Sequence, residues 1–116
     1  MIEQALPAII VISLLFALYS LFMKGGDVNG ADARRLVQAG ARLIDVRTPG
    51  EFAAGHLPGA SNLPLQELAG RLGELGAKDS PIVLYCRSGA RSASAARSLK
   101  TAGFAAVRNL GGMGRW

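Results

Sequence analysis

The hydrophobic residues of the chain form one long uninterrupted run, followed by short apolar segments that glycines separate. The run extends from Leu6 to Met23, reads LPAIIVISLLFALYSLFM and contains no charged residue. As an α-helix it would span roughly 27 Å, about the thickness of the hydrocarbon core of a bilayer. A cleaved signal peptide is the main alternative, but the run is long for one and no basic residue precedes it. We therefore interpret residues 1–24 as an uncleaved anchor with a transmembrane helix over residues 6–23.

The basic residues around this run predict its orientation in the membrane. None lies on its N-terminal side, whereas Lys24, Arg34 and Arg35 follow its C-terminal end. The positive-inside rule then places the rest of the chain in the cytoplasm. The opposite, extracytoplasmic side is the alternative.

After the anchor, residues 25–30 (GGDVNG) are typical of a flexible linker, and residues 31–116 are expected to form one domain. Glycines and apolar periodicity predict helices over 31–39, 51–54 and 90–102. Another helix is predicted to start at Pro64, with one apolar face made by Leu65, Leu68, Leu72 and Leu75. Strands are predicted over 43–46, 60–62 and 82–85 and around Val107. Short strands that alternate with helices indicate an α/β domain with a parallel sheet.

Composition narrows the classes of function. The chain has 116 residues, of which 50% are hydrophobic and 18% charged, which excludes a disordered or coiled-coil protein. One cysteine and one histidine exclude an intramolecular disulfide and a multi-cysteine zinc site, and we expect no metal or other cofactor. The net charge of +5 suits an anionic membrane surface. No aromatic residues interleave with a basic stripe, so no nucleic-acid partner is expected.

The segment around the single cysteine carries the candidate chemistry. Cys86 ends an apolar strand, and a glycine-containing loop leads from it into a helix. At the carboxyl end of a parallel strand, backbone N–H groups of such a loop form a binding site for an anion. Arg87 and Arg91 add positive charge, and we expect these charges and the backbone donors together to lower the thiol pKa and make the sulfur nucleophilic. The alternative is that Cys86 is a small buried hydrophobic residue.

Three segments together resemble the rhodanese, or thiosulfate sulfurtransferase, domain family. They are LIDVRTPGEFAAGHLPGASNLP (Leu43 to Pro64), CRSGAR (Cys86 to Arg91) and NLGGMGRW (Asn109 to Trp116). The resemblance covers residues 31–116 and implies a small three-layer α/β/α domain with a mainly parallel sheet. It also implies that Cys86 is the catalytic residue. The anion-binding loop would consist of Arg87, Ser88, Gly89, Ala90, Arg91 and Ser92.

The resemblance implies a sulfurtransferase that needs no cofactor. A Cys86 persulfide would form from a donor such as thiosulfate and be consumed by cyanide or a thiol. The alternative function is a persulfide carrier without turnover, or a sulfur-relay or interaction module at the membrane. Cysteine-dependent phosphatases carry an arginine six positions after the cysteine, whereas here the arginine is at position five and Ser92 at six. The shorter loop suits a single sulfur atom better than phosphate.

The other residues of these motifs receive weaker assignments. Asp45 and Arg47 are interpreted as a buried ion-paired framework for the turn, with contact to the substrate as the alternative. His56 is interpreted as structural rather than as a general base. Ser88 and Ser92 either cap the helix after the loop or hydrogen-bond the persulfide. Rhodanese domains usually begin with a short strand, for which the residues before the first helix are poor candidates.

Overall fold

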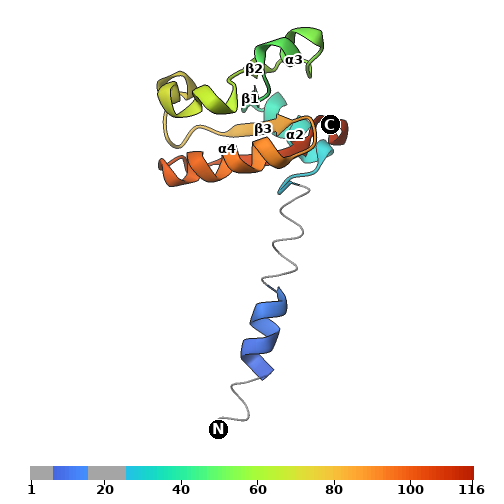
Figure 1. The fold of residues 1–116 in the computed structure, drawn as a ribbon, viewed down its shortest axis with the longest axis vertical. Helices are drawn as coiled ribbons and strands as arrows, with labels where there is room; N and C mark the ends of the chain where they lie inside the picture. Colours follow the sequence, from blue (N-terminus) through green and yellow to red (C-terminus); the bar gives the residue numbers. More distant parts are fainter. Residues whose placement is uncertain (1–6, 16–25) are drawn as a thin grey trace.

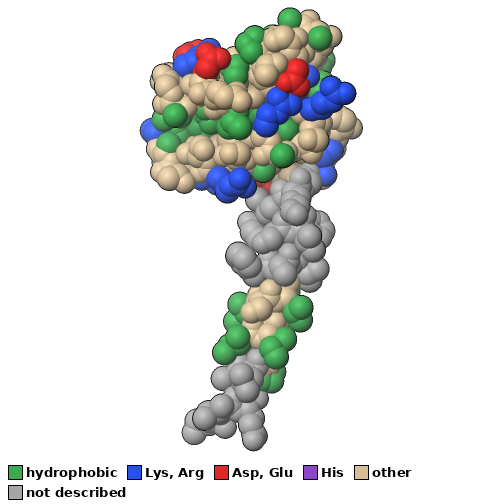
Figure 2. All heavy atoms as spheres, in the orientation of Figure 1, with side chains coloured by type: hydrophobic (Ala, Val, Ile, Leu, Met, Phe, Trp, Pro, Cys, Tyr) green, Lys and Arg blue, Asp and Glu red, His purple; other side chains and the backbone are tan. Residues whose placement is uncertain are grey.

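The computed structural model describes residues 7–15 and 26–116. Residues 7–15 form a helix whose aliphatic side chains are exposed, Ile12 by 66% (Figure 2). No helix within the described parts of the chain is long and apolar enough to cross a membrane. Residues 1–6 and 16–24 of the predicted anchor lie outside the described residues. The transmembrane helix over residues 6–23 therefore stays a prediction.

Four parallel strands form one sheet in the order β2-β1-β3-β4 (Figure 1). They are β1 (Arg42–Asp45), β2 (Ser61–Asn62), β3 (Ile82–Cys86) and β4 (Val107–Gly112). The central strand β3 pairs with β1 on one side and with β4 on the other. All five of its residues are buried, as a continuous apolar run in a parallel sheet requires. These strands confirm the predicted α/β class and parallel sheet.

Helices cover both faces of the sheet. α2 (Gly30–Gln38) covers one face and α4 (Ala90–Thr101) the other, whereas the short α3 (Pro49–Ala54) follows the end of β1 and has no buried residue. Because strand side chains alternate between the two faces, Leu84 of β3 packs with Leu99 of α4, while Val83 and Tyr85 pack with Ala33 of α2. The two separate cores confirm a three-layer α/β/α domain, in which Cys86 faces the α4 side.

The single helix predicted to start at Pro64 is wrong. Two 3₁₀ helices, η1 (Leu65–Gly70) and η2 (Leu72–Leu75), occupy this segment. Gly70 and Gly73 weaken a continuous α-helix, and Arg71 between the two helices leaves the helical conformation, with φ of −128° and ψ of 23°. The predicted apolar face is nevertheless present, with Leu68 and Leu75 buried and Leu65 and Leu72 packed against the core. The leucine spacing suits both kinds of helix.

The part of the predicted linker that the structure describes, residues 26–30, makes specific contacts with the domain. The amides of Asp27 and Val28 donate to the carbonyl of Asn109 in β4, at 2.8 and 3.3 Å. The Asn109 amide donates in return to the Asp27 carboxylate at 2.7 Å. Asn29 then caps α2 by accepting from the Asp32 amide at 2.8 Å. This segment therefore covers the β4 edge of the sheet without forming a regular strand.

Candidate active site

The sulfur of Cys86 lies at the carboxyl end of the central strand. β3 ends at Cys86, and α4 begins four residues later at Ala90. Gly89 makes the turn between them with φ of 110°, a left-handed conformation that glycine adopts without strain. The Cys86 residue is only 1% exposed. Because β3 ends at Cys86, the sulfur lies inside the loop that follows this strand.

Groups of the loop and of the first turn of α4 surround the sulfur. The Gly89 amide donates to Cys86 Sγ at 3.0 Å and the Ser92 amide at 3.4 Å. As a thiol, Cys86 donates from Sγ to the Ser92 hydroxyl oxygen at 3.4 Å, and once the sulfur is a thiolate the hydroxyl donates to it instead. A buried hydrophobic cysteine would lack such donors. The geometry therefore favours the reactive interpretation of Cys86 over the alternative of a hydrophobic core residue.

Burial and hydrogen bonding act on the pKa of Cys86 in opposite directions. Burial raises this pKa, because it disfavours the charged thiolate. Hydrogen bonds from the Ser92 hydroxyl and amide and from the amides of Gly89 and Ser88 lower it, and the net result is a lowered pKa. The predicted direction is confirmed. The loop donors contribute as predicted, with the Ser92 hydroxyl in addition, and Arg91 also interacts with the Cys86 thiolate through its charge.

Ser92 faces the sulfur and does not cap the helix. The N-cap position of α4 is Gly89, and no side chain caps this helix. Besides Cys86 Sγ, the fully buried Ser92 hydroxyl lies 3.1 Å from the Gly89 carbonyl. Of the two roles that the sequence left open for Ser92, the structure therefore supports contact with the sulfur. Ser88 is exposed and its backbone amide contributes to lowering the Cys86 pKa.

The last arginine of the loop is paired with a carboxylate from another element. Arg91 Nη1 and Nη2 donate to Glu51 Oε1 and Oε2 of α3 at 2.6 and 3.0 Å. Arg91 is the first cause of a Glu51 pKa lowered to about 2, and hydrogen bonds from Thr48 add to it. Glu51 also closes a capping box with Thr48 at the start of α3. Only that local role is visible in sequence, because 40 residues separate the paired side chains.

Asp45 and Arg47 form the buried framework that the sequence suggested. Arg47 Nη2 lies 2.8 Å from Asp45 Oδ2, and both side chains are almost completely buried. The same Arg47 nitrogen donates to the Gly55 carbonyl at 2.6 Å, which ties the end of α3 to the end of β1. Asn62 Nδ2 donates to the carbonyls of both residues of the ion pair. This network supports the strand ends next to the cysteine loop.

His56 follows the C-terminal end of α3, and its side chain contacts Phe52 of this helix. Its Nδ1 lies 2.9 Å from the Phe52 carbonyl oxygen, and its ring stacks on Phe52 with centroids 3.7 Å apart. The side chain is otherwise exposed. These contacts support the structural interpretation of His56.

Two glycines of β4 allow this strand to approach the loop closely. The register between β3 and β4 shifts after Leu84, and Gly111 then adopts φ of 91° with its amide bonded to the Asn109 side chain at 2.9 Å. A Cβ on Gly112 would lie 3.0 Å from the Arg87 carbonyl oxygen. The sequence pattern contained these glycines within NLGGMGRW, but nothing in it indicated which contact required them.

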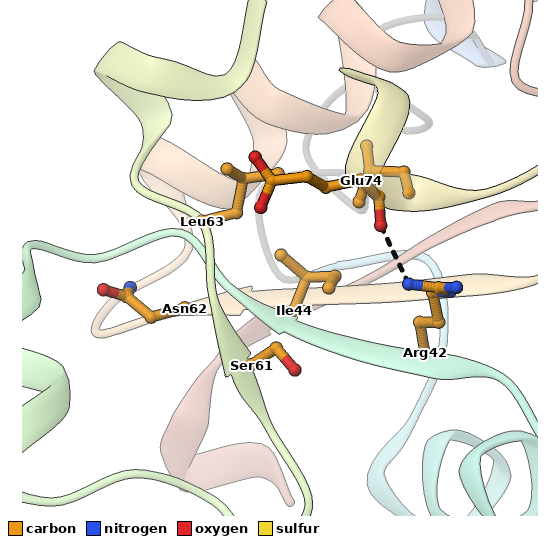
Figure 3. A pocket seen from close by; sticks show the side chains of 7 residues that line it. Arg42, Ile44, Ser61, Asn62, Leu63 and Glu74 are labelled. Carbon is orange, nitrogen blue, oxygen red and sulfur yellow. Dashed lines mark hydrogen bonds between the residues drawn. The ribbon is translucent and has the colours of Figure 1, made fainter. Parts of the chain in front are cut away.

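A separate pocket of about 230 Å³ lies between β1, β2 and η2 (Figure 3). The side chains of Arg42 and Asn62, which line it, already have partners within the protein. Arg42 donates to the Glu74 carbonyl at 2.8 Å, and Asn62 donates to backbone carbonyls as described above. Cys86 does not line it. The pocket is therefore distinct from the cysteine loop.

Comparison with known proteins places this site in a family context. The model of the rhodanese-like domain matches residues 30–116. A sulfurtransferase of Allochromatium vinosum is 42% identical over 95 residues, which cover 77% of this chain and 88% of that protein. The uncharacterized protein YqhL of Bacillus subtilis is 46% identical over 77 residues, and the chain spans only 60% of its length. The human single-domain sulfurtransferase TSTD1 has a similar structure, with a TM-score of 0.63 and 32% identity over 73% of this chain and 88% of that one.

Proposed function

The chain belongs to the rhodanese-like domain family, and we propose that it transfers a sulfane sulfur from an anionic donor to a thiophilic acceptor through a persulfide on Cys86. The arrangement of donors around Cys86 Sγ is the observation that carries this function. The Gly89 amide and the Ser92 amide and hydroxyl stabilise an anionic sulfur in a site from which water is largely excluded. Relatives that are named sulfurtransferases support the same reaction class.

The reaction consists of two displacements at sulfur. The Cys86 thiolate attacks the outer sulfur of thiosulfate, a new S–S bond forms, and sulfite leaves with the electron pair of the broken S–S bond. An acceptor, cyanide or a thiolate, then attacks the outer sulfur of the persulfide. The Cys86 thiolate is the leaving group of this second step and is ready for another cycle. The lowered pKa of Cys86 assists both steps, because the thiolate is first nucleophile and then leaving group.

Intact-mass spectrometry of the full chain, before and after incubation with thiosulfate, tests this function. We expect a gain of about 32 Da, one sulfur atom, which cyanide removes. The Cys86→Ser variant is the control and gains nothing. Absence of an adduct from thiosulfate and from other sulfane donors would contradict the proposal. A persulfide that forms without multiple turnover would instead identify a sulfur carrier or relay module.

We further propose that residues 6–23 anchor the domain in a membrane and that the domain faces the cytoplasm. The length and uncharged character of this run support the anchor, as do the exposed aliphatic side chains of the helix over residues 7–15. Lys24, Arg34 and Arg35 support the orientation. A cytoplasmic location would bring the site into contact with the reduced thiols of that compartment.

A further inference from the structure

The ion pair between Glu51 and Arg91 joins the turn of α3 to the cysteine loop. Both side chains are about one-third exposed, and their two hydrogen bonds form the planar fork that arginine and carboxylate share. In the chain, Arg91 lies between Gly89 and Ser92, which donate to Cys86 Sγ. The ion pair that fixes Arg91 therefore also restricts the positions of these donors.

We propose that Glu51 is a positioning residue for sulfur transfer: through Arg91 it holds the loop so that Gly89 and Ser92 donate to Cys86 Sγ. This presupposes the proposed function of Cys86. Glu51 does not itself contact the sulfur, and its effect reaches the reacting atom through Arg91.

Hydrogen bonds at both ends of α3 fix the position of Glu51. Its carboxylate accepts from the Thr48 amide and hydroxyl at 3.3 and 3.1 Å, and its amide donates to the Thr48 hydroxyl at 3.2 Å. The other end of α3 is held by the bond from Arg47 to the Gly55 carbonyl. Arg47 is in turn paired with Asp45 at the end of β1. A continuous series of bonds thus connects the sheet to Arg91.

The same pair partly neutralises the charge of Arg91. The charged groups around the loop come from β1 and its end, from α3 and from the loop itself, and they are Asp45, Arg47, Glu51, Arg87 and Arg91. Both carboxylates among them are paired with an arginine. The low Glu51 pKa keeps the pair ionised throughout the neutral range. Arg91 therefore acts on the sulfur through the position of the loop donors as well as through its own charge.

The test compares two isosteric substitutions, Glu51→Gln and Glu74→Gln, in the full chain. Glu74 is a matched control, since it also forms a two-bond pair with an arginine, Arg71, at 2.6 and 2.8 Å, but lies outside the cysteine loop. Because the chain has one cysteine, ultraviolet thiolate absorbance measured against Cys86→Ser reports on Cys86 alone. We expect Glu51→Gln to reduce the thiolate fraction at pH 7 roughly fivefold, a typical coupling between neighbouring residues, and Glu74→Gln to leave it unchanged.

Kinetics with thiosulfate provides a second readout. Glu51→Gln should lower kcat while KM for thiosulfate changes little, because the donors to the sulfur are displaced and the exposed loop residues Arg87 and Ser88 remain. Arg91→Lys keeps the positive charge but not the fork, and should reproduce the effect if Glu51→Gln does not fold. In the Arg91→Lys background, Glu51→Gln should have no further effect on the thiolate fraction.

Two results would overturn the positioning role. One is a Glu51→Gln thiolate titration identical to that of wild type, with only thermal stability reduced, which would indicate a purely structural ion pair. The other is a higher thiolate fraction, which would mean that the released charge of Arg91 outweighs the geometry. The titration requires no sulfur transfer. If wild type takes up no sulfur from thiosulfate, the proposed function fails while the titration still decides the role of Glu51.

Discussion

At the scale of single residues, Ser92 contributes two of the hydrogen-bond donors that reach the sulfur of Cys86. Its amide belongs to the first turn of α4 and its hydroxyl is fully buried. Both donors favour the thiolate over the thiol, and together with Gly89 and Ser88 they outweigh the effect of burial. A serine at this position therefore matters for chemistry as well as for packing.

Substitution Ser92→Ala removes the hydroxyl donor and keeps the amide. Because that donor lowers the pKa of Cys86, its loss raises the pKa, and less thiolate is present at neutral pH. We expect the rate of sulfur uptake from thiosulfate at pH 7 to fall on the order of tenfold, and the activity profile to move to higher pH. Ser98→Ala, an exposed serine on the same helix, is the control. An unchanged pH profile in Ser92→Ala would assign the lowered pKa to the backbone amides alone.

At the scale of elements, β4 and the cysteine loop fit together because β4 carries glycines. The bulge after Leu84 is stabilised by the Asn109 side chain, which accepts from the Gly111 amide. Gly112 then passes directly below the backbone of Arg87 and Ser88. A side chain at position 112 would contact the backbone of the cysteine loop too closely.

Substitution Gly112→Ala tests this contact. The new Cβ would lie 3.0 Å from the Arg87 carbonyl oxygen, so the loop must shift by a few tenths of an ångström. We expect a loss of stability of about 1 kcal/mol in thermal or denaturant unfolding, together with slower sulfur uptake from thiosulfate. Gly114→Ala is the matched control, since a Cβ there meets nothing within 4 Å. Equal uptake rates for the two variants would show that the loop tolerates the shift.

At the scale of the whole molecule, the chain combines a folded, basic α/β domain with an N-terminal apolar run. Basic side chains lie at several places on the face of the domain that Figure 2 shows, and aliphatic side chains line the helix of residues 7–15. The domain buries its own apolar residues in two cores on either side of the sheet. The exposed aliphatic residues of the N-terminal helix contribute to neither core, which suits a separate role in a membrane.

The double variant Ile12→Lys, Leu15→Lys tests the proposed anchor. Each charge in the apolar run costs about 2.5–3.5 kcal/mol of insertion free energy, so the variant should leave the membrane fraction on alkaline extraction, whereas wild type stays. The variant Ile12→Leu, Leu15→Ile keeps the run apolar and should behave like wild type. For wild type, protease added to the cytoplasmic face should digest the domain and protease on the outer face should not. Release of wild type by alkaline extraction would contradict the anchor.

Most of the elements of this fold could be predicted from local sequence patterns. The buried run of β3, the cysteine loop and the helix after it were all recognisable, because strand burial, glycine turns and helix periodicity depend on neighbouring residues. The same reasoning failed for η1 and η2, where one leucine spacing suits two kinds of helix. It also gave no sign of the contact between the predicted linker and β4, since Asp27 accepts from Asn109, which lies 82 residues away.

The sequence by itself determined the order of the elements, the apolar faces that form the two cores, and the position of Cys86 at the end of a central strand. Only the tertiary structure decided which polar groups meet around that cysteine. The pairing of Glu51 with Arg91 and the contact of Gly112 with the loop depend on the sheet order and on the register of β4. Secondary structure follows from local hydrogen bonds and periodicity, whereas contacts between distant residues follow from the packing of whole elements, which no local pattern contains.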